Sequence, residues 1–240
     1  MRAASTGPPA TALPVDSAVP TEIATELRAD ARRNRDQILL AARDVFIDRG
    51  PSAPLDEIAR RAGVGNATLY RRFPDRQALL RAVVLDVFRR VGDEARLALS
   101  EAPDAFAALA RYMHRALDLR IGAVMPALIG LVEVDDEVAH ARDDLTWCVK
   151  HMLDHAHADG TLRPDVVVGD IGTVLIRFSR PLPGQLPPEL DDGLAHRHLD
   201  LLIDGLRALA GRGAGTLRGP STTLEDLRTA SKDPEAHDSD

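Results

Sequence analysis

The chain has 240 residues, of which 45% are hydrophobic and 28% are charged, a composition typical of a globular protein with its own core. A single cysteine excludes an internal disulfide, and no apolar run approaches the ~20 residues that span a bilayer, so we expect a cytoplasmic protein without a membrane partner. The net charge of −7 would also disfavour nucleic acid as a partner if it were spread evenly along the chain.

The charge is not spread evenly. Residues 27–92 contain 14 arginines and 8 acidic residues, a net charge of +6, whereas residues 93–240 carry a net charge of −11. A basic module attached to an acidic body suits a protein that meets DNA at one end only.

The N-terminal part divides into an arm and a helix. Residues 1–28 contain four prolines among small polar residues, so we expect a disordered arm there. A strong amphipathic pattern then predicts a helix over residues 29–49. Arg32 and Arg33 crowd the start of this helix, where cations oppose the helix dipole. We interpret both as side chains that contact DNA phosphates.

The next stretch, Leu55–Phe73, has the pattern of two short helices joined by a tight turn. Apolar residues recur at helical spacing in its first part, and Gly63 ends this helix because a glycine reaches the left-handed conformation without a Cβ clash. The second part, from Asn66 on, buries Leu69 and leaves polar side chains outside. This is the helix-turn-helix arrangement, in which the second helix enters a major groove.

An ordinary helical hairpin within a core is the alternative interpretation of this stretch. Such a hairpin buries or pairs its charges, whereas residues 60–76 carry five arginines beside hydroxyls and an amide. The concentration of cations therefore favours DNA binding.

Two runs of residues, Ile58–Val64 (IARRAGV) and Thr68–Phe73 (TLYRRF), together resemble the DNA-binding domain of the TetR family of bacterial transcriptional regulators. The resemblance covers about a quarter of the chain, roughly residues 32–91. Three positions depart from the family pattern. Pro54 stands where Ser or Thr usually caps the second helix, Gly65 stands where Ser usually opens the recognition helix, and Arg72 stands where His is frequent. The first two departures remove hydroxyls that cap a helix or touch a phosphate.

The resemblance and the exposed polar side chains together predict nine DNA contacts. Phosphate contacts are expected from Arg32, Arg33, Thr68, Tyr70, Arg72 and Arg76. Base contacts are expected from Asn66, Ala67 and Arg71, because an amide pairs with adenine and a guanidinium with guanine in the major groove.

Helical patterns continue through the rest of the chain, and no sustained two-residue alternation predicts a strand. Pro74 and Asp75 open a fourth helix, which in the TetR family links the DNA-binding domain to the ligand domain. Further helices are expected near residues 103–121, 124–132, 135–158, 165–179 and 191–210.

We therefore expect an all-α protein of about nine helices, with an N-terminal three-helix helix-turn-helix domain. The expected parts are a disordered arm (1–28), a DNA-binding domain that includes the linking helix (29–92), a helical ligand-binding and dimerisation domain (93–212) and a disordered tail (213–240).

The last two expected helices carry apolar stripes that suit a homodimer. Their members are Ile171, Val174, Leu175, Phe178, Leu199, Leu202, Ile203 and Leu206. The TetR family dimerises through two such helices from each subunit, so the resemblance implies the same four-helix interface here. The alternative is that both stripes face the core of a single subunit.

A regulator of this kind needs an effector pocket in its helical body. The candidate lining residues are Tyr112, His114, Trp147, His151 and Phe178. Because the body contains few rings, an aliphatic or small polar effector is favoured over a large stacking one. No cofactor is expected.

A metal effector is the alternative. Cys148, His151 and His155 fall at i, i+3 and i+7 on one helix face, and thiolate and imidazole ligands suit zinc, copper or nickel. The outer two lie about 10 Å apart along the helix axis, so a single ion would need ligands from another helix, and no metal site is assigned.

An enzyme is disfavoured, because the chain lacks a GxSxG elbow, a Walker loop, an HExxH motif and a dinucleotide fingerprint. We predict a homodimeric repressor that leaves a palindromic DNA operator when a small molecule binds its C-terminal helical domain.

Overall fold

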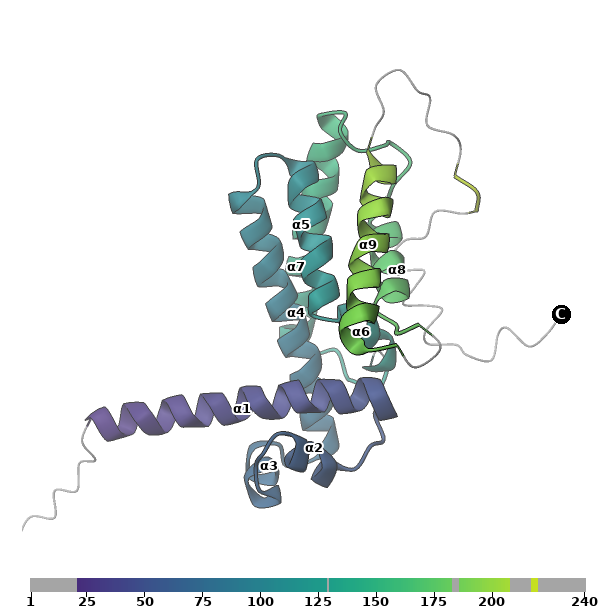
Figure 1. Cartoon of the computed structure of the whole chain (residues 1–240). Coiled ribbons are helices and arrows are strands. Elements are labelled where there is room, and N and C mark those ends of the chain that lie inside the picture. The colour runs from purple at the N-terminus through teal and green to yellow at the C-terminus, as the bar shows by residue number, and fades with distance from the viewer. Residues whose placement is uncertain (1–20, 129, 183–185, 208–216, 220–240) are drawn as a thin grey trace, which may run out of the picture.

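The computed structural model describes residues 21–128, 130–182, 186–207 and 217–219. These residues form nine helices and no strand (Figure 1), which confirms the all-α prediction. In chain order the helices are α1 (Thr21–Arg49), α2 (Leu55–Arg61), α3 (Asn66–Arg72), α4 (Arg76–Glu101), α5 (Ala105–Asp118), α6 (Ile121–Leu128), α7 (Asp136–Ala158), α8 (Val168–Phe178) and α9 (Pro188–Leu206).

The first three helices and the start of α4 form a small module at one end of the molecule. Its core is made by apolar side chains that are almost fully buried, among them Phe46, Ile58, Leu69 and Leu79. Gly63 has a φ of +69°, and the amide of Val64 donates to the carbonyl of Ala59 at 3.0 Å, so the turn predicted between α2 and α3 is present.

Helix α4 joins this module to the body. The side chain of Asp75 caps its start by accepting a hydrogen bond from the backbone amide of Ala78 at 2.8 Å. The helix then continues through Gly92 to Glu101, and Figure 1 shows it rising from the lower module into the bundle.

The domain boundary expected after residue 92 therefore lies inside a continuous helix. A glycine weakens a helix interior by only ~1 kcal/mol relative to alanine. The buried residues that follow it, Ala95 and Ala98, hold α4 against its neighbours. At this position the packing of α4 outweighs the low helix propensity of glycine.

The body is a bundle in which α4, α5 and α7 pack against one another, with α8 and α9 side by side at its edge (Figure 1). Helix α6 lies between the two parts, in contact with α1, α4 and α8. The core contains Leu109, Met113, Leu128 and Met152, each almost fully buried.

Several predicted boundaries differ from the structure. Helix α1 begins at Thr21 and not at residue 29, so residues 21–28 of the predicted arm are helical. The last helix begins at Pro188, which suits a first helical turn because the missing amide has no partner there. The remaining residues of the predicted arm, and most of the predicted tail, lie outside the described residues.

Candidate nucleic-acid interface

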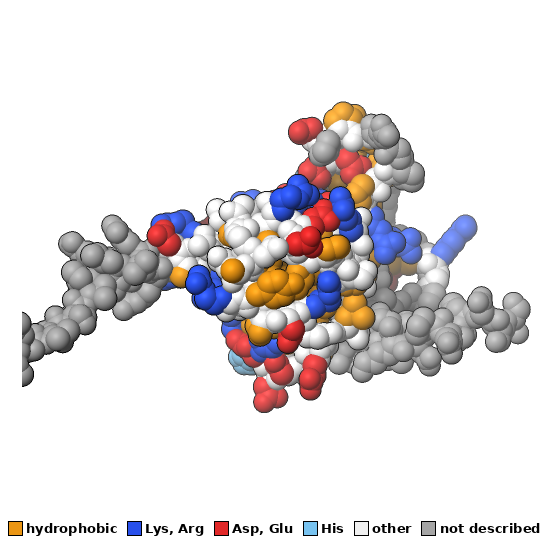
Figure 2. Space-filling view, turned by 90° about the horizontal axis from the view of Figure 1, so that it is seen from below, with side chains coloured by type: hydrophobic (Ala, Val, Ile, Leu, Met, Phe, Trp, Pro, Cys, Tyr) orange, Lys and Arg blue, Asp and Glu red, His pale blue; other side chains and the backbone are white. Residues whose placement is uncertain are grey.

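Helix α3 presents polar side chains on the outer surface of the small module. Its one fully buried residue, Leu69, anchors the helix, while Asn66, Ala67 and Arg71 are exposed and Tyr70 is 50% exposed. Figure 2, which views this end of the molecule, shows basic side chains scattered among acidic ones around exposed hydrophobic side chains. The candidate base-contacting residues therefore lie on an accessible surface.

The arginines predicted to contact DNA fall into two groups. Within the described part of the chain, the exposed guanidinium groups of Arg32 and Arg71 make no hydrogen bond or ion pair. Arg33 pairs with Asp30 one turn earlier on α1. Arg72 donates from Nη2 to the carbonyl oxygen of Ala31 at 2.7 Å, so it ties α3 to α1 while remaining exposed.

Arg76 has a structural role that the sequence did not indicate. Its Nη1 atom donates to the carbonyl oxygens of Pro51 at 2.8 Å and Ala53 at 2.6 Å, in the loop that joins α1 to α2. The guanidinium of Arg76 is half-buried and already holds two carbonyl groups, so the predicted phosphate contact loses its basis.

The arginines of α2 are also paired. Arg61 lies 3.0 Å from Asp48 and 3.7 Å from Asp44, both on α1, and Arg60 lies 3.7 Å from Glu57. The prediction that this module carries unpaired cations is therefore wrong for α2. The partners of Arg61 lie on another helix, more than ten residues away in sequence, so the local pattern did not indicate them.

A second ion-pair cluster joins α4 to α7 and was not foreseen. Arg81 donates from Nε to Asp135 at 2.5 Å and from Nη2 to Glu137 at 2.6 Å, and Arg89 donates to the other oxygen of Glu137 at 2.6 Å. The hydrogen bonds from Arg81 hold the pKa values of Asp135 and Glu137 below their usual range. The side chain of Asp135 also caps α7 by accepting a hydrogen bond from the backbone amide of Val138. An acidic residue at the start of a predicted helix is the one feature of this cluster that the sequence could indicate.

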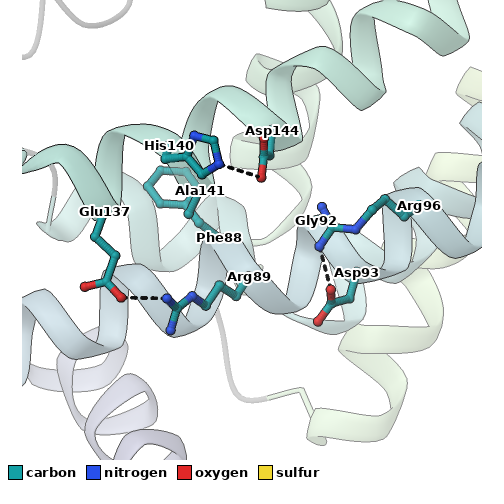
Figure 3. Close-up of a pocket in the computed structure, with 9 residues that line it drawn as sticks. All are labelled: Phe88, Arg89, Gly92, Asp93, Arg96, Glu137, His140, Ala141 and Asp144. Carbon is teal, nitrogen blue, oxygen red and sulfur yellow. Dashed lines mark hydrogen bonds and ion pairs between the residues drawn. The ribbon is translucent and has the colours of Figure 1, made fainter.

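A cavity of about 340 Å³ lies beside this cluster, between α4 and α7 (Figure 3). Its lining residues are Phe88, Arg89, Gly92, Asp93, Arg96, Glu137, His140, Ala141 and Asp144. Two ion pairs lie at this cavity, Arg89–Glu137 and Arg96–Asp93, each at 2.6 Å, and Nε2 of His140 lies 3.8 Å from a carboxylate oxygen of Asp144.

The residues predicted to line an effector pocket do not gather around one cavity. Tyr112 is buried in the core, where burial raises the pKa of its phenol, and His114 bonds His196 and Asp200 between α5 and α9. Trp147 is 61% exposed and stacks on His151, with ring centroids 5.0 Å apart.

Phe178, the fifth predicted lining residue, borders a separate cavity of about 140 Å³ beside the start of α9. The other four line neither of these two cavities. The sequence alone does not distinguish a buried aromatic residue such as Tyr112 from an exposed one such as Trp147, because an aromatic ring can pack in a core or lie at a surface.

Of the residues considered as metal ligands, His151 and His155 lie close together, with ring centroids 4.0 Å apart, but Cys148 and His155 have different surroundings. Cys148 is buried, and burial raises the pKa of its thiol, whereas His155 is exposed. Among the described residues, no three His, Cys, Asp or Glu side chains are grouped so that they could hold a metal ion. A metal-responsive mechanism through Cys148, His151 and His155 therefore has no structural support.

Most of the predicted dimer stripe lies inside the subunit. Ile171, Leu175, Leu199, Ile203 and Leu206 are buried within it. These five cannot contact a second subunit across a surface, because the core of their own subunit covers them. Val174, Phe178 and Leu202 remain half-buried.

A different stripe of α9 faces outward. Leu190 is 50% exposed, Leu194 is half-buried and Leu201 is 63% exposed, and these residues share one helical face at i, i+4 and i+11. The sequence contains this spacing, but the opposite face of the helix carries a more regular apolar stripe with Leu199, Ile203 and Leu206, which the prediction used instead.

No helix in the described part of the chain is both long and apolar enough to cross a membrane.

Comparison with known proteins connects both parts of the chain to regulators. Residues 38–83 match the family described as bacterial regulatory proteins, tetR family, and residues 103–208 match the transcriptional regulator SbtR-like C-terminal domain. A TetR transcriptional regulator from Streptomyces coelicolor is 34% identical with a TM-score of 0.54, and the match covers 72% of this chain and 98% of that structure.

Two regulators of Mycolicibacterium smegmatis are similar over shorter lengths. The transcriptional repressor LfrR is 41% identical over 91 residues, 36% of this chain and 46% of LfrR. Its crystal structure in complex with proflavine has a TM-score of 0.52 at 25% identity and covers 70% of this chain and 95% of that structure.

The transcriptional activator FasR is 49% identical over 59 residues, 24% of this chain and 26% of FasR. In these sequence matches the chain spans between a quarter and a half of the length of the curated relatives.

Proposed function

Because the chain belongs to the TetR family of bacterial DNA-binding transcriptional regulators, we propose that it is a homodimeric repressor that a small molecule releases from a palindromic operator. The observation that carries this proposal is the surface of α3. Its buried Leu69 fixes the helix on the module, and Asn66, Ala67 and Arg71 are left exposed in one short segment.

We assign base readout to this segment. Arg71 has no partner among the described residues, so its guanidinium is available for bidentate bonding to guanine. Asn66 stands at the first position of α3 and offers an amide to adenine. Ala67 is small enough to let the helix approach the bases closely.

Phosphate contacts are assigned to side chains around α3. Arg32 on α1 is exposed and unpaired within the described structure, and Tyr70 and Arg72 lie on the outward side of α3. Arg33 and Thr68 are kept as further contacts, although Arg33 must exchange Asp30 for a phosphate. Arg76 is removed from the set, because two loop carbonyls occupy it.

We propose that the dimer forms through the outer faces of α8 and α9. Leu190 and Leu201 are large apolar residues exposed on α9, and Val174, Phe178 and Leu202 lie half-buried on the two helices. Exposed apolar side chains gathered on paired helices favour association between copies of the chain. A two-fold symmetric dimer would present two α3 helices to two half-sites.

Repression is preferred to activation because the match with the repressor LfrR extends over 36% of this chain and the match with the activator FasR over 24%. The structure of LfrR with proflavine supports a small organic molecule as the class of effector. We propose that effector binding favours a dimer whose α3 spacing no longer fits the operator, a population shift driven by differential affinity.

Selection of binding sites from a random pool of DNA tests the proposal. The full chain is expected to enrich a pseudo-palindrome whose half-sites are centred about one helical turn of DNA, or a multiple of it, apart. The Arg71→Ala variant is expected to lose preference at one base pair of each half-site. Failure of the unmodified chain to enrich any sequence would overturn the proposal.

A further inference from the structure

Four polar side chains form a continuous row between α5 and α9, here called the histidine link. The Nδ1 atoms of His114 on α5 and His196 on α9 lie 2.8 Å apart. Nε2 of His114 lies 3.0 Å from a carboxylate oxygen of Asp200 on α9, and Nε2 of His196 lies 2.9 Å from one of Asp118 on α5. Each of these contacts therefore joins one helix to the other.

The two imidazole rings of the link meet edge to edge. Their planes differ by only 12°, and their centroids lie 5.1 Å apart. Because the two Nδ1 atoms are much closer to each other than the centroids are, both atoms lie between the ring centres and nearly in the plane of both rings. This is the geometry of an N–H···N hydrogen bond, in which the lone pair of one ring points at the hydrogen of the other.

This arrangement determines how many protons the two rings carry. An ionised carboxylate only accepts hydrogen bonds, so each Nε2 atom must carry a hydrogen to donate to Asp118 or Asp200. The two facing Nδ1 atoms need a single hydrogen between them, since one must donate and the other accept. One histidine of the link is therefore positively charged and the other is neutral.

A change of one proton in either direction removes a hydrogen bond from the link. If a proton is lost, two lone pairs face each other at the Nδ1 atoms, or a lone pair faces a carboxylate. If a proton is gained, two N–H groups on two charged rings face each other. Histidine is the side chain that ordinarily changes charge between about pH 5 and 8, so both changes lie within an accessible range of pH.

The other charged groups around the link are carboxylates and guanidinium groups. Arg115 lies 3.3 Å from Asp118 and 3.6 Å from Glu94, which belongs to α4. The charged residues that line the small cavity beside His196 are Asp118, Arg120, Asp191 and Asp192. Among the described residues that line this cavity, the end of α8 adds only the uncharged Phe178 and Ser179. Since carboxylates and guanidinium groups ordinarily change charge outside pH 5–8, the two histidines determine the response of the link in that range.

The first half of α9 depends on the link for its attachment. The fully buried residues of α9 are Leu199, Ile203 and Leu206, all in the second half of the helix. From residue 189 to residue 198 no side chain is fully buried. Within the described chain, His196 supplies the only side-chain hydrogen bonds that connect this stretch to another helix.

We propose that the histidine link is a pH-sensitive contact that holds the first half of α9 against α5 while the two rings carry one positive charge between them. Gain of a second charge and loss of the first both break the contact. Leu190 and Leu194 lie on this half of α9, so pH also determines how firmly this part of the proposed dimer surface is held. This last consequence rests on the proposed dimer.

Amide hydrogen exchange of the full-length protein, measured between about pH 5 and 9, tests the link. Protection factors of residues 189–198 are compared, because they correct for the direct effect of pH on exchange. We expect protection to be highest at an intermediate pH and to fall about five-fold on either side, the effect of losing one hydrogen bond. His196→Gln is expected to abolish this maximum. The matched control is His198→Gln, because His198 is exposed on the same helix and makes no hydrogen bond within the described structure.

A second histidine variant separates the link from ordinary packing. Because both rings act in one contact, the double variant His114→Gln/His196→Gln is expected to be protected as well as either single variant. Nitrogen NMR of the unmodified chain is expected to show both Nε2 atoms protonated at the pH of highest protection. Protection that does not vary with pH, or a maximum that survives in His196→Gln, would overturn the proposed link.

The consequence for the dimer is tested by light scattering over a range of protein concentrations and pH. We expect the dissociation constant of the dimer to rise several-fold on either side of the intermediate pH, and to vary little with pH in His196→Gln. A dimer that is insensitive to pH, together with exchange that is sensitive to it, overturns the consequence and leaves the link standing. A monomer at all concentrations overturns the proposed dimer and this consequence, and the exchange result still decides the link.

Discussion

At the scale of single residues, two arginines close to each other in sequence have different roles. Arg71 is exposed and has no partner within the described structure, whereas Arg76 is half-buried and donates to the carbonyls of Pro51 and Ala53. The pattern of the helix predicted the burial of Leu69 and the exposure of Arg71. It did not predict the role of Arg76, because its partners lie more than twenty residues away along the chain.

Replacing Arg76 should therefore affect stability. Arg76→Ala leaves two carbonyls of a tight loop without their charged donor, so we expect the free energy of unfolding to fall by about 2 kcal/mol. Arg71→Ala, the matched control, is expected to change it by less than ~0.5 kcal/mol, since no described contact is lost. Urea denaturation followed by circular dichroism measures both, and equal stability of the two variants would refute the structural role of Arg76.

Substitutions on α3 should distinguish residues that recognise a base from residues that only strengthen binding to the DNA backbone. Arg71→Ala is expected to reduce discrimination at one base pair of each half-site by ~1–3 kcal/mol, the value of a bidentate contact. Tyr70→Ala is expected to weaken binding to all operator sequences alike, because a phosphate contact carries no sequence information. Fluorescence anisotropy with a set of single-base operator variants checks both. A change of base preference in Tyr70→Ala would show that its role is wrongly assigned.

At the scale of helices, two glycines show that tertiary packing determines where a helix continues and how closely two helices approach, which local propensity does not predict. The predicted DNA-binding domain ends at residue 92, yet α4 continues past Gly92, because buried residues on both sides hold the helix. Gly122 on α6 had no assigned role, yet it lies directly against the backbone of α8. The number and order of the helices could be predicted from periodicity, whereas these contacts depend on the tertiary approach of two elements.

Alanine at the two positions should have opposite effects. At Gly122 a Cβ atom would lie 2.2 Å from the carbonyl oxygen of Leu175, so Gly122→Ala must push α6 away from α8 and is expected to lower stability by ~1–3 kcal/mol. At Gly92 the nearest atom lies 3.7 Å away, so Gly92→Ala is expected to raise stability by up to ~1 kcal/mol. Thermal denaturation measures whether each variant is less or more stable than the unmodified chain. A stabilised Gly122→Ala protein would contradict the close contact of α6 with α8.

At the scale of the whole molecule, most of the apolar stripe predicted for the dimer contact is buried within the subunit. The regular spacing of Leu199, Ile203 and Leu206 marks a stripe that the subunit itself buries. Periodicity identifies a stripe that must be covered, and it does not say whether the cover comes from the same chain or from another. The exposed residues Leu190 and Leu201 are the better candidates for contact with a second subunit.

A charge on the outer face of α9 should separate the subunits. Leu201 is 63% exposed, so Leu201→Glu leaves the core of the subunit intact and places a carboxylate in the proposed interface. Light scattering coupled to gel filtration is expected to show a dimer for the unmodified chain and a lower mass for this variant at the same concentration. The control, Leu97→Glu, changes an exposed leucine of α4 and is expected to stay dimeric. Equal masses for the two variants would place the interface elsewhere.

The distribution of charge over the molecule leads to the most direct test of the account. The basic module and the acidic body together predict that only one end of the protein meets DNA. The measurement is the affinity for a selected operator and for a scrambled sequence of the same length, repeated at increasing salt concentration. We predict that the operator is bound far more tightly than the scrambled DNA and that log K falls linearly with log salt, with a slope of about −0.9 for each phosphate contacted. Equal affinity for the two sequences at all salt concentrations would contradict the conclusion that α3 reads DNA.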